Sequence, residues 1–191
     1  MPESRTPGVA AIDALLPQTQ CTRCGFDGCL PYAEALAAGE AALNRCPPGG
    51  ARTIGQLAAL LGRPVLPLDG TCGRESPPLI AWIDAGRCIG CARCLPPCPT
   101  DAIIGARRRL HTVIASDCMG CELCVAACPA DCIVIRPRAA ADGPAPSPQD
   151  NRRRYHAHRD RSQRRAAAQA QLLAERKRDA GTSAPPSSPA P

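Results

Sequence analysis

The 191-residue sequence is poor in aromatic side chains, with one Phe, two Tyr and one Trp. Aromatic residues supply much of the buried area of most cores, so we expect no large conventional core. No run of 18 or more apolar residues occurs, and we therefore expect no membrane-spanning segment. The basic start and unbroken apolar stretch of a secretory signal are also missing, because Asp13 and Pro17 interrupt the N-terminal region.

Cysteine, by contrast, is abundant, with 14 residues. Such a number indicates either a secreted disulfide scaffold or a metal protein. Without a secretory signal, a reducing compartment is expected, in which the cysteines stay reduced and metal binding is their natural use. We therefore place the chain in the cytoplasm, either free or peripheral on the cytoplasmic face of the inner membrane.

Residues 79–137 contain an internal duplication at an offset of 30 residues. Each copy carries the pattern Cys-x2-Cys-x2-Cys-x3-Cys-Pro, and two copies predict pseudo-twofold symmetry rather than a solenoid. A single helical turn is expected in each copy, at Ala92–Pro97 and Glu122–Ala127. Strands at Ala102–Gly105 and Leu110–Ala115 are expected to meet in a loose hairpin.

The spacing of the repeat is that of bacterial ferredoxins, where three close cysteines bind one cubane and the fourth binds the neighbouring one. We therefore expect two [4Fe-4S] clusters in this domain. The predicted ligands are Cys88, Cys91, Cys94 and Cys128 for one cluster, and Cys98, Cys118, Cys121 and Cys124 for the other. Zinc is the alternative, but zinc sites favour separated Cys-x2-Cys pairs over a run of three.

A further set of four cysteines precedes the repeat. Its spacing is Cys-x2-Cys-x4-Cys-x16-Cys, and its members are Cys21, Cys24, Cys29 and Cys46. Three close thiolates and a fourth that returns after a helix can also surround a cubane, and Gly25 and Gly28 allow the loop to turn tightly. On spacing alone, zinc stays open for this set.

Two cysteines and one histidine stand apart from these three sets. Cys132 occupies the place that Ala102 has in the first copy, which favours a small buried side chain over a ligand. Cys72 is expected to be an ordinary loop position, with an exchangeable ligand or a redox-sensitive thiol as alternatives. His111 is expected to be a half-exposed strand residue, with contact to a cluster environment as the alternative. No nucleophile–base pair, dinucleotide fingerprint or phosphate loop is present, so no catalytic site is predicted.

Composition divides the chain into five parts and predicts an α+β fold. In residues 1–50, helices are expected at residues 6–16, with Thr6 as the N-cap, and at Tyr32–Leu43. The connector should contain a helix at Thr53–Leu61 that ends at Gly62. The parts are residues 1–50 with the first cysteine set, the connector 51–78, the two-cluster ferredoxin domain 79–137, the linker 138–151 and the basic tail 152–191.

The formal charge of +6 resides entirely in residues 150–191, because 13 arginines and 13 acidic residues cancel in residues 1–149. Helix formers continue through Asp179, and the segment from Thr182 is expected to be disordered. A solvated, arginine-rich helix or coil is the expected structure of the tail, with docking onto anionic lipid, an acidic partner or the chain's own body as the alternative. Nucleic-acid binding is not expected, because Tyr155 is the tail's only stacking aromatic.

Both cysteine regions, in this order, resemble the B subunit of the Rnf (or Rsx) electron-transport complex. The similarity covers residues 9–136 and includes Leu16–Cys21 and Asn44–Gly50 around the first cysteine set, and Cys128–Ile133 at the end of the repeat. The resemblance implies a third [4Fe-4S] cluster at Cys21, Cys24, Cys29 and Cys46.

The resemblance also implies a subunit that relays electrons in a membrane complex coupling ferredoxin and nicotinamide redox chemistry to ion movement. Members of that family typically begin with a membrane-spanning helix, whereas only 20 residues precede Cys21 here. Because the implied role is a relay of electrons, the expected partners are redox proteins, foremost the other subunits of such a complex. A free polycluster ferredoxin that donates electrons to a cytosolic enzyme is the alternative.

Overall fold

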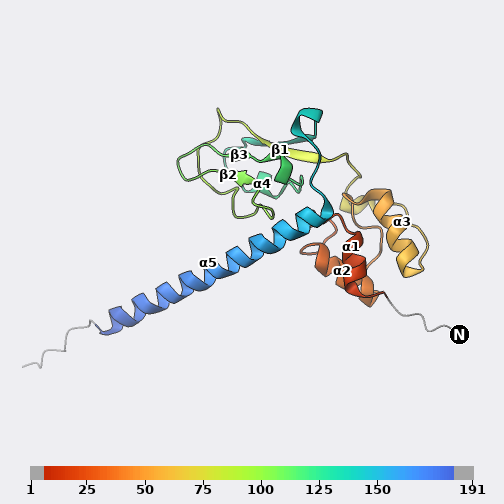
Figure 1. Cartoon of the computed structure of the whole chain (residues 1–191), viewed down its shortest axis with the longest axis horizontal. Coiled ribbons are helices and arrows are strands. Elements are labelled where there is room, and N and C mark those ends of the chain that lie inside the picture. The colour runs from red at the N-terminus through yellow and green to blue at the C-terminus, as the bar shows by residue number, and fades with distance from the viewer. Residues whose placement is uncertain (1–6, 183–191) are drawn as a thin grey trace, which may run out of the picture. The chain divides into compact units, whose positions relative to one another are not determined.

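The computed structural model describes residues 7–182 and divides the chain into two compact units between Tyr155 and His156. The first unit holds all 14 cysteines, and the second consists of the continuation of one long helix (Figure 1). Thr6 and residues 183–191, for which a helix cap and a disordered end were predicted, lie outside the described residues.

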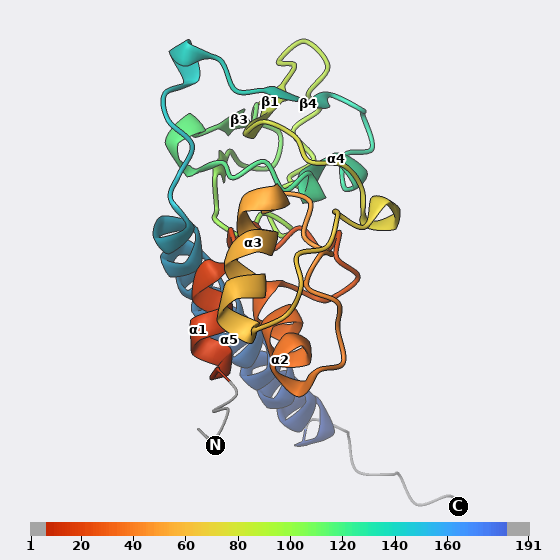
Figure 2. The same ribbon diagram turned by 90° about the vertical axis from the view of Figure 1, so that its right-hand side faces the viewer.

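Three helices form the N-terminal part of the first unit: α1 (Val9–Leu15), α2 (Cys29–Ala38) and α3 (Gly50–Leu61). They pack together in Figure 2 because each contributes apolar side chains to one buried core. Its largest members, each at most 1% exposed, are Ile12, Leu16, Tyr32, Leu36, Ile54 and Leu57. The helix that the sequence placed in the connector thus packs with the first cysteine set, and it ends at Gly62 in the left-handed conformation, as predicted.

The helix α2 begins three residues before its predicted start and ends at Gly39 rather than Leu43. Its early start follows from a long-range cap, since the backbone N–H of Cys29 donates to the side-chain oxygen of Gln20 at 2.9 Å. Its early end follows from Gly39, which adopts the left-handed conformation at φ +79°. The cap brings the loop before Cys21 against the first turn of α2.

The ferredoxin repeat folds around two short antiparallel sheets. Strand β1 (Leu79–Ile83) pairs with β4 (Ile133–Pro137), and β2 (Ile103–Ile104) pairs with β3 (Thr112–Val113). The register is itself symmetric, because the pair Ile83–Ile133 in one sheet corresponds to Val113–Ile103 in the other at an offset of 30. The mixture of helices and small sheets agrees with the predicted α+β class, and the predicted hairpin is present as a two-residue ladder.

The loops of the two copies repeat the same backbone conformation. Left-handed φ angles recur at three pairs of positions 30 residues apart, namely Gly90 and Gly120, Ala92 and Glu122, and Asp101 and Asp131. The glycines are required for space as well, because a side chain at Gly90 would meet the backbone of Arg109, and one at Gly120 would meet the backbone of Leu79. The duplication seen in the sequence is therefore present in the backbone.

The helical turn predicted in the first copy is wrong. The second copy has its helical turn, α4 (Leu123–Ala126), whereas the segment Ala92–Pro97 forms a series of turns without helix. The physical reason is local: Pro96 and Pro97 lack the N–H groups that would close the turn, and their counterparts in the second copy are alanines.

The long helix α5 (Pro148–Thr182) begins inside the predicted linker. Ser147 caps it, because its hydroxyl accepts from the backbone N–H of Asp150 at 3.1 Å, and Pro148 occupies the first helical position. Within the described range, no helix combines the length and the apolar character that crossing a membrane requires.

Two of the first tail arginines are tied to the first unit by ion pairs. Arg152 lies 2.7 Å from Asp13, and Arg154 lies 2.6 Å from Asp117, whose side chain is largely buried. The start of the basic tail is therefore part of the folded body rather than a solvated segment.

Candidate iron–sulfur sites

The twelve cysteines of the three predicted sets gather in three places, all within the first unit. We call the groups site 1, site 2 and site 3. Site 1 comprises Cys21, Cys24, Cys29 and Cys46; site 2 comprises Cys88, Cys91, Cys94 and Cys128; site 3 comprises Cys98, Cys118, Cys121 and Cys124. All fourteen cysteines of the chain are free of disulfides.

The thiols of site 1 are close enough to influence one another. Burial, with smaller contributions from the charges of Cys21 and Cys24, raises the pKa of Cys29 to about 12. Burial likewise raises the pKa of Cys46, with added contributions from the other three cysteines of the set. Four like charges in a buried place are unfavourable unless a cation offsets them, which is the situation that a metal centre resolves.

Tyr32 connects the two ends of site 1. Its hydroxyl donates to the carbonyl of Ala42 at 2.8 Å and accepts from the backbone N–H of Arg45 at 3.3 Å, directly before Cys46. The ring also packs on Phe26, with centroids 5.3 Å apart, in the loop that follows Cys24. This buried tyrosine therefore brings the distant fourth cysteine to the other three.

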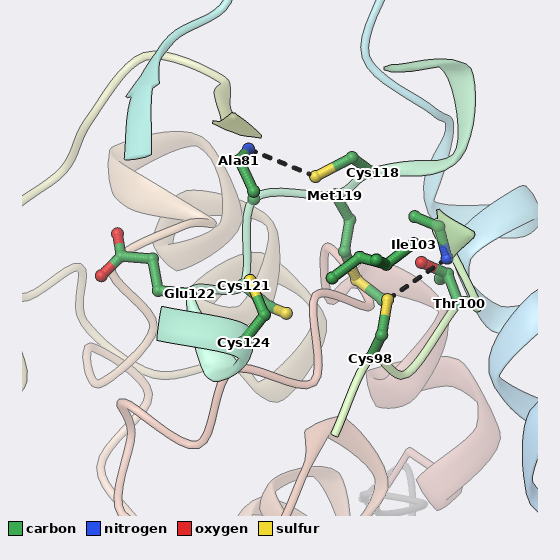
Figure 3. A pocket seen from close by; sticks show the side chains of 11 residues that line it. Ala81, Cys98, Thr100, Ile103, Cys118, Met119, Cys121, Glu122 and Cys124 are labelled. Carbon is green, nitrogen blue, oxygen red and sulfur yellow. Dashed lines mark hydrogen bonds between the residues drawn. The ribbon is translucent and has the colours of Figure 1, made fainter. Parts of the chain in front are cut away.

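The four cysteines of site 3 line one pocket (Figure 3). Two of its sulfurs accept backbone hydrogen bonds, Cys98 from Ala102 at 3.2 Å and Cys118 from Ala81 at 3.5 Å. Burial, with smaller contributions from Cys121, Cys98 and Cys118, raises the pKa of Cys124 to about 12. The fourth cysteine of the first copy thus lies with the first three of the second copy.

Site 2 is the counterpart in the other half and surrounds a pocket of about 280 Å³. Burial raises the pKa of Cys94, and Cys91, Cys128 and Cys88 raise it further. Cys128 comes from the second copy, so the exchange of fourth cysteines is reciprocal. These are the groupings that the ferredoxin spacing predicts for ligands.

No three of the chain's described Cys, His, Asp and Glu side chains converge tightly enough to hold a single metal ion. Thiolates at the corners of a cubane each contact a different iron, and they lie farther apart than four thiolates on one zinc.

Two side chains that the sequence placed outside the sites line the pocket of site 2. His111 is only 4% exposed rather than half-exposed, and its Nδ1 lies 3.7 Å from the sulfur of Cys88. Cys132 is buried, as predicted, but its sulfur lies 3.4 Å from that of Cys128. Burial and the contact with Cys128 raise the pKa of the Cys132 thiol to about 12.

Cys72, for which the sequence predicts an ordinary loop position, has a buried side chain. The residue ends the short 3₁₀ helix η1 (Gly70–Cys72) and is buried beside site 1. Its sulfur lies 3.8 Å from the carboxylate of Asp69 and contacts the guanidinium of Arg45. Burial raises the pKa of Cys24, with smaller contributions from Cys21 and Cys72, which places Cys72 near this set.

Site 1 lies beside site 3. Arg23, between two cysteines of site 1, forms an ion pair with Glu122, between two cysteines of site 3. Cys21 also contributes to the raised pKa of Cys121, which reaches about 12 chiefly through burial. Sites 1 and 3 are therefore neighbours, and site 3 shares its two-copy domain with site 2.

Comparison with known families supports iron–sulfur chemistry in both regions. Residues 81–135 match the model of the 4Fe-4S dicluster domain, and residues 16–48 match a family described as "Putative Fe-S cluster". The first match covers all of sites 2 and 3 with most of the surrounding strands, and the second covers site 1.

Curated relatives match across both regions. The chain is 58% identical over 108 residues to the B subunit of an ion-translocating oxidoreductase complex from Alkalilimnicola ehrlichii, which is 56% of this chain and 58% of that protein. Proteins of the same name from an Azoarcus species and from Thiobacillus denitrificans are 56% and 55% identical over 108 and 111 residues. The matches span 56–58% of this chain and 58–59% of these relatives. The chain is thus similar to B subunits of ion-translocating oxidoreductase complexes across both cysteine regions, and it spans less than two thirds of their length.

Proposed function

We propose that this chain is an electron carrier that holds three [4Fe-4S] clusters, one each at sites 1, 2 and 3, and that it serves as the B subunit of an Rnf/Rsx-like complex. The observation that carries the proposal is the reciprocal placement of Cys98 and Cys128, each beside the other copy's three cysteines. A zinc scaffold has no need of this exchange, whereas a pair of cubanes uses it.

The residues of the sites fit such clusters. Every ligand is a thiol free of disulfides, and in site 3 two sulfurs accept from backbone N–H groups, Cys98 from Ala102 and Cys118 from Ala81. A bound cluster supplies one-electron redox chemistry at a potential set by its surroundings. The protein's part is to hold the thiolates, donate hydrogen bonds to their sulfurs and exclude water.

The packing of the sites favours a relay in a fixed order. The ion pair between Arg23 and Glu122 holds the loops of sites 1 and 3 against each other, and sites 3 and 2 share one small domain. Electrons would therefore pass between site 1 and site 2 by way of site 3. The sequence carries no motif for hydride or group transfer, so the proposed substrates are electrons from, and for, partner proteins.

Stepwise reduction of the anaerobically prepared full chain tests this function. We expect three successive one-electron reductions, each with a paramagnetic signal of a reduced cubane. Fewer than three electrons in a protein with full iron content would refute the relay. Co-purification with the membrane-bound complex, rather than with the free cytosolic fraction, distinguishes a component of the complex from a free polycluster ferredoxin.

We also propose that the arginine-rich part of α5 beyond Tyr155 docks onto an anionic surface. Its side chains at residues 161–179 are exposed, and its six Arg and Lys residues in that stretch outnumber its two acidic residues. Because Arg152 and Arg154 belong to the folded body, the deletion that tests this idea should remove residues 156–191 only. We expect unchanged iron content and weaker association at low salt, and equal association with and without the segment would refute it.

A further inference from the structure

The two halves of the ferredoxin repeat differ at two positions that face ligand sulfurs. At the offset of 30 residues, Ala81 corresponds to His111, and Ala102 corresponds to Cys132. Both alanines line site 3, and both polar residues line site 2. The duplication therefore keeps the ligands but changes the side chains that surround their sulfurs.

At the first position, the alanine of site 3 is replaced by a cysteine in site 2. The N–H of Ala102 donates to Cys98 at 3.2 Å in site 3, and Cys132 stands at the equivalent place beside Cys128 in site 2. In site 2 the sulfur of Cys132 also lies 3.4 Å from that of Cys128 and contacts Cys88. A ligand thiolate carries no proton and can only accept, so the thiol of Cys132 is the donor.

At the second position, a backbone donor is replaced by an imidazole. In site 3 the N–H of Ala81 donates to Cys118 at 3.5 Å, and in site 2 the Nδ1 of His111 lies 3.7 Å from Cys88. The same argument assigns the proton to Nδ1 once Cys88 is a ligand. The other ring nitrogen, Nε2, is buried and has no hydrogen-bond partner among the described residues. A side chain at Gly105 would overlap the ring, so the imidazole is closely packed.

The polar side chains that line site 3 offer no comparable donor. The hydroxyl of Thr100 donates to the backbone carbonyl of Asp117 at 2.9 Å. The carboxylate of Glu122 pairs with Arg23 and points away from the sulfurs in Figure 3. Site 2 therefore has two additional side-chain donors toward its ligand sulfurs, and site 3 has none from its lining.

We propose that Cys132 and His111 are positioning residues whose hydrogen bonds make the site 2 cluster the more easily reduced of the ferredoxin pair. The inference rests on the proposed function, since it concerns clusters bound at these sites. Hydrogen bonds to ligand sulfur disperse negative charge, and reduction adds negative charge, so they stabilise the reduced cluster more than the oxidised one. Site 2, the end of the proposed relay, is then where an electron comes to rest.

The test is a redox titration of the anaerobically prepared full chain, followed by electron paramagnetic resonance at constant pH. Cys132→Ala and His111→Leu each remove one donor, and Cys132→Ser keeps a hydroxyl donor of similar size. We expect each of the first two to lower the potential of the higher-potential ferredoxin cluster by about 59 mV, a tenfold change in the equilibrium constant of its one-electron reduction. The potential of the lower-potential cluster should change by less than the experimental error. In Cys132→Ser, the potential of the higher-potential cluster should stay close to the wild-type value.

Ala102→Cys is the matched control, because it places a thiol at the equivalent position beside Cys98 in site 3. We expect it to raise the potential of the lower-potential cluster and to narrow the gap between the two. Unchanged potentials in Cys132→Ala and Ala102→Cys at full iron content would overturn the inference while leaving the carrier function intact. A wild-type chain without redox-active clusters would instead refute the proposed function itself.

Discussion

The exchange of fourth ligands predicts an unusual outcome for pairs of cysteine substitutions. Cys88 and Cys128 lie 40 positions apart in different copies, yet they line the same pocket. Cys118 and Cys128 belong to the same copy and the same local motif, yet they line different pockets. The iron content of two double variants therefore distinguishes exchanged fourth ligands from clusters that each copy closes with its own four cysteines.

The magnitudes follow from four irons in each cubane. With twelve irons in the intact chain, the variant with Cys88→Ala and Cys128→Ala damages site 2 alone and should retain about eight irons. The variant with Cys118→Ala and Cys128→Ala damages sites 2 and 3 and should retain about four. Had each copy closed its own cluster, the two values would be reversed.

The assay is iron and acid-labile sulfide per chain after anaerobic reconstitution and gel filtration. Cys72→Ala is the control for the loss of a buried cysteine outside the three sites, and it should retain about twelve irons. Reversed values for the two double variants would refute the reciprocal arrangement. A similar loss in both would mean that the sites are not independent.

Further predictions concern stability. Tyr32→Phe leaves the carbonyl of Ala42 without its donor, which should lower the free energy of unfolding by about 1–3 kcal/mol and loosen iron at site 1 first, as measured by thermal unfolding and chelator kinetics. Arg154→Ala leaves the buried carboxylate of Asp117 without its cation and should lower the free energy of unfolding in denaturant by about 1–3 kcal/mol. Arg153→Ala is the control: it breaks an exposed pair with Asp150 and should lower the free energy of unfolding by less than about 1 kcal/mol. Removal of iron by a chelator should expose the amides of β1 and β4 to hydrogen exchange before those of α2 and α3, because six of the twelve buried side chains in the ferredoxin core are cysteines. Equal protection of both regions in the metal-free chain would contradict this last prediction.

The features that depend on local sequence could be predicted. The two cysteine sets of the repeat follow from spacing, the N-terminal set from spacing together with the family resemblance, and the cysteines of each set lie near one another in the structure. Gly62 ends α3 because a glycine after an apolar helix adopts the left-handed conformation with no side-chain clash. The hairpin between β2 and β3 follows from the duplication, since its register copies that of β1 and β4.

The features that depend on distant partners could not be predicted in this way. The start of α2 is set by Gln20, nine residues before Cys29, and no local capping signal marks it. His111 lies beside Cys88, 23 residues earlier in the chain. The residues around His111 do not indicate this contact, and the signal in the sequence is its alignment with Ala81 across the repeat. The sequence alone indicates that Arg152 belongs to a solvated basic run, because its partner Asp13 lies 139 residues earlier in the chain.

The central claim is that twelve thiolates of this chain hold three iron–sulfur cubanes. The measurement that tests it most directly is the content of iron, acid-labile sulfide and zinc in the full chain prepared without oxygen. We expect about twelve irons and about twelve sulfides per chain, with zinc below one equivalent. A colourless protein that holds zinc at the three sites and no acid-labile sulfide would contradict the account.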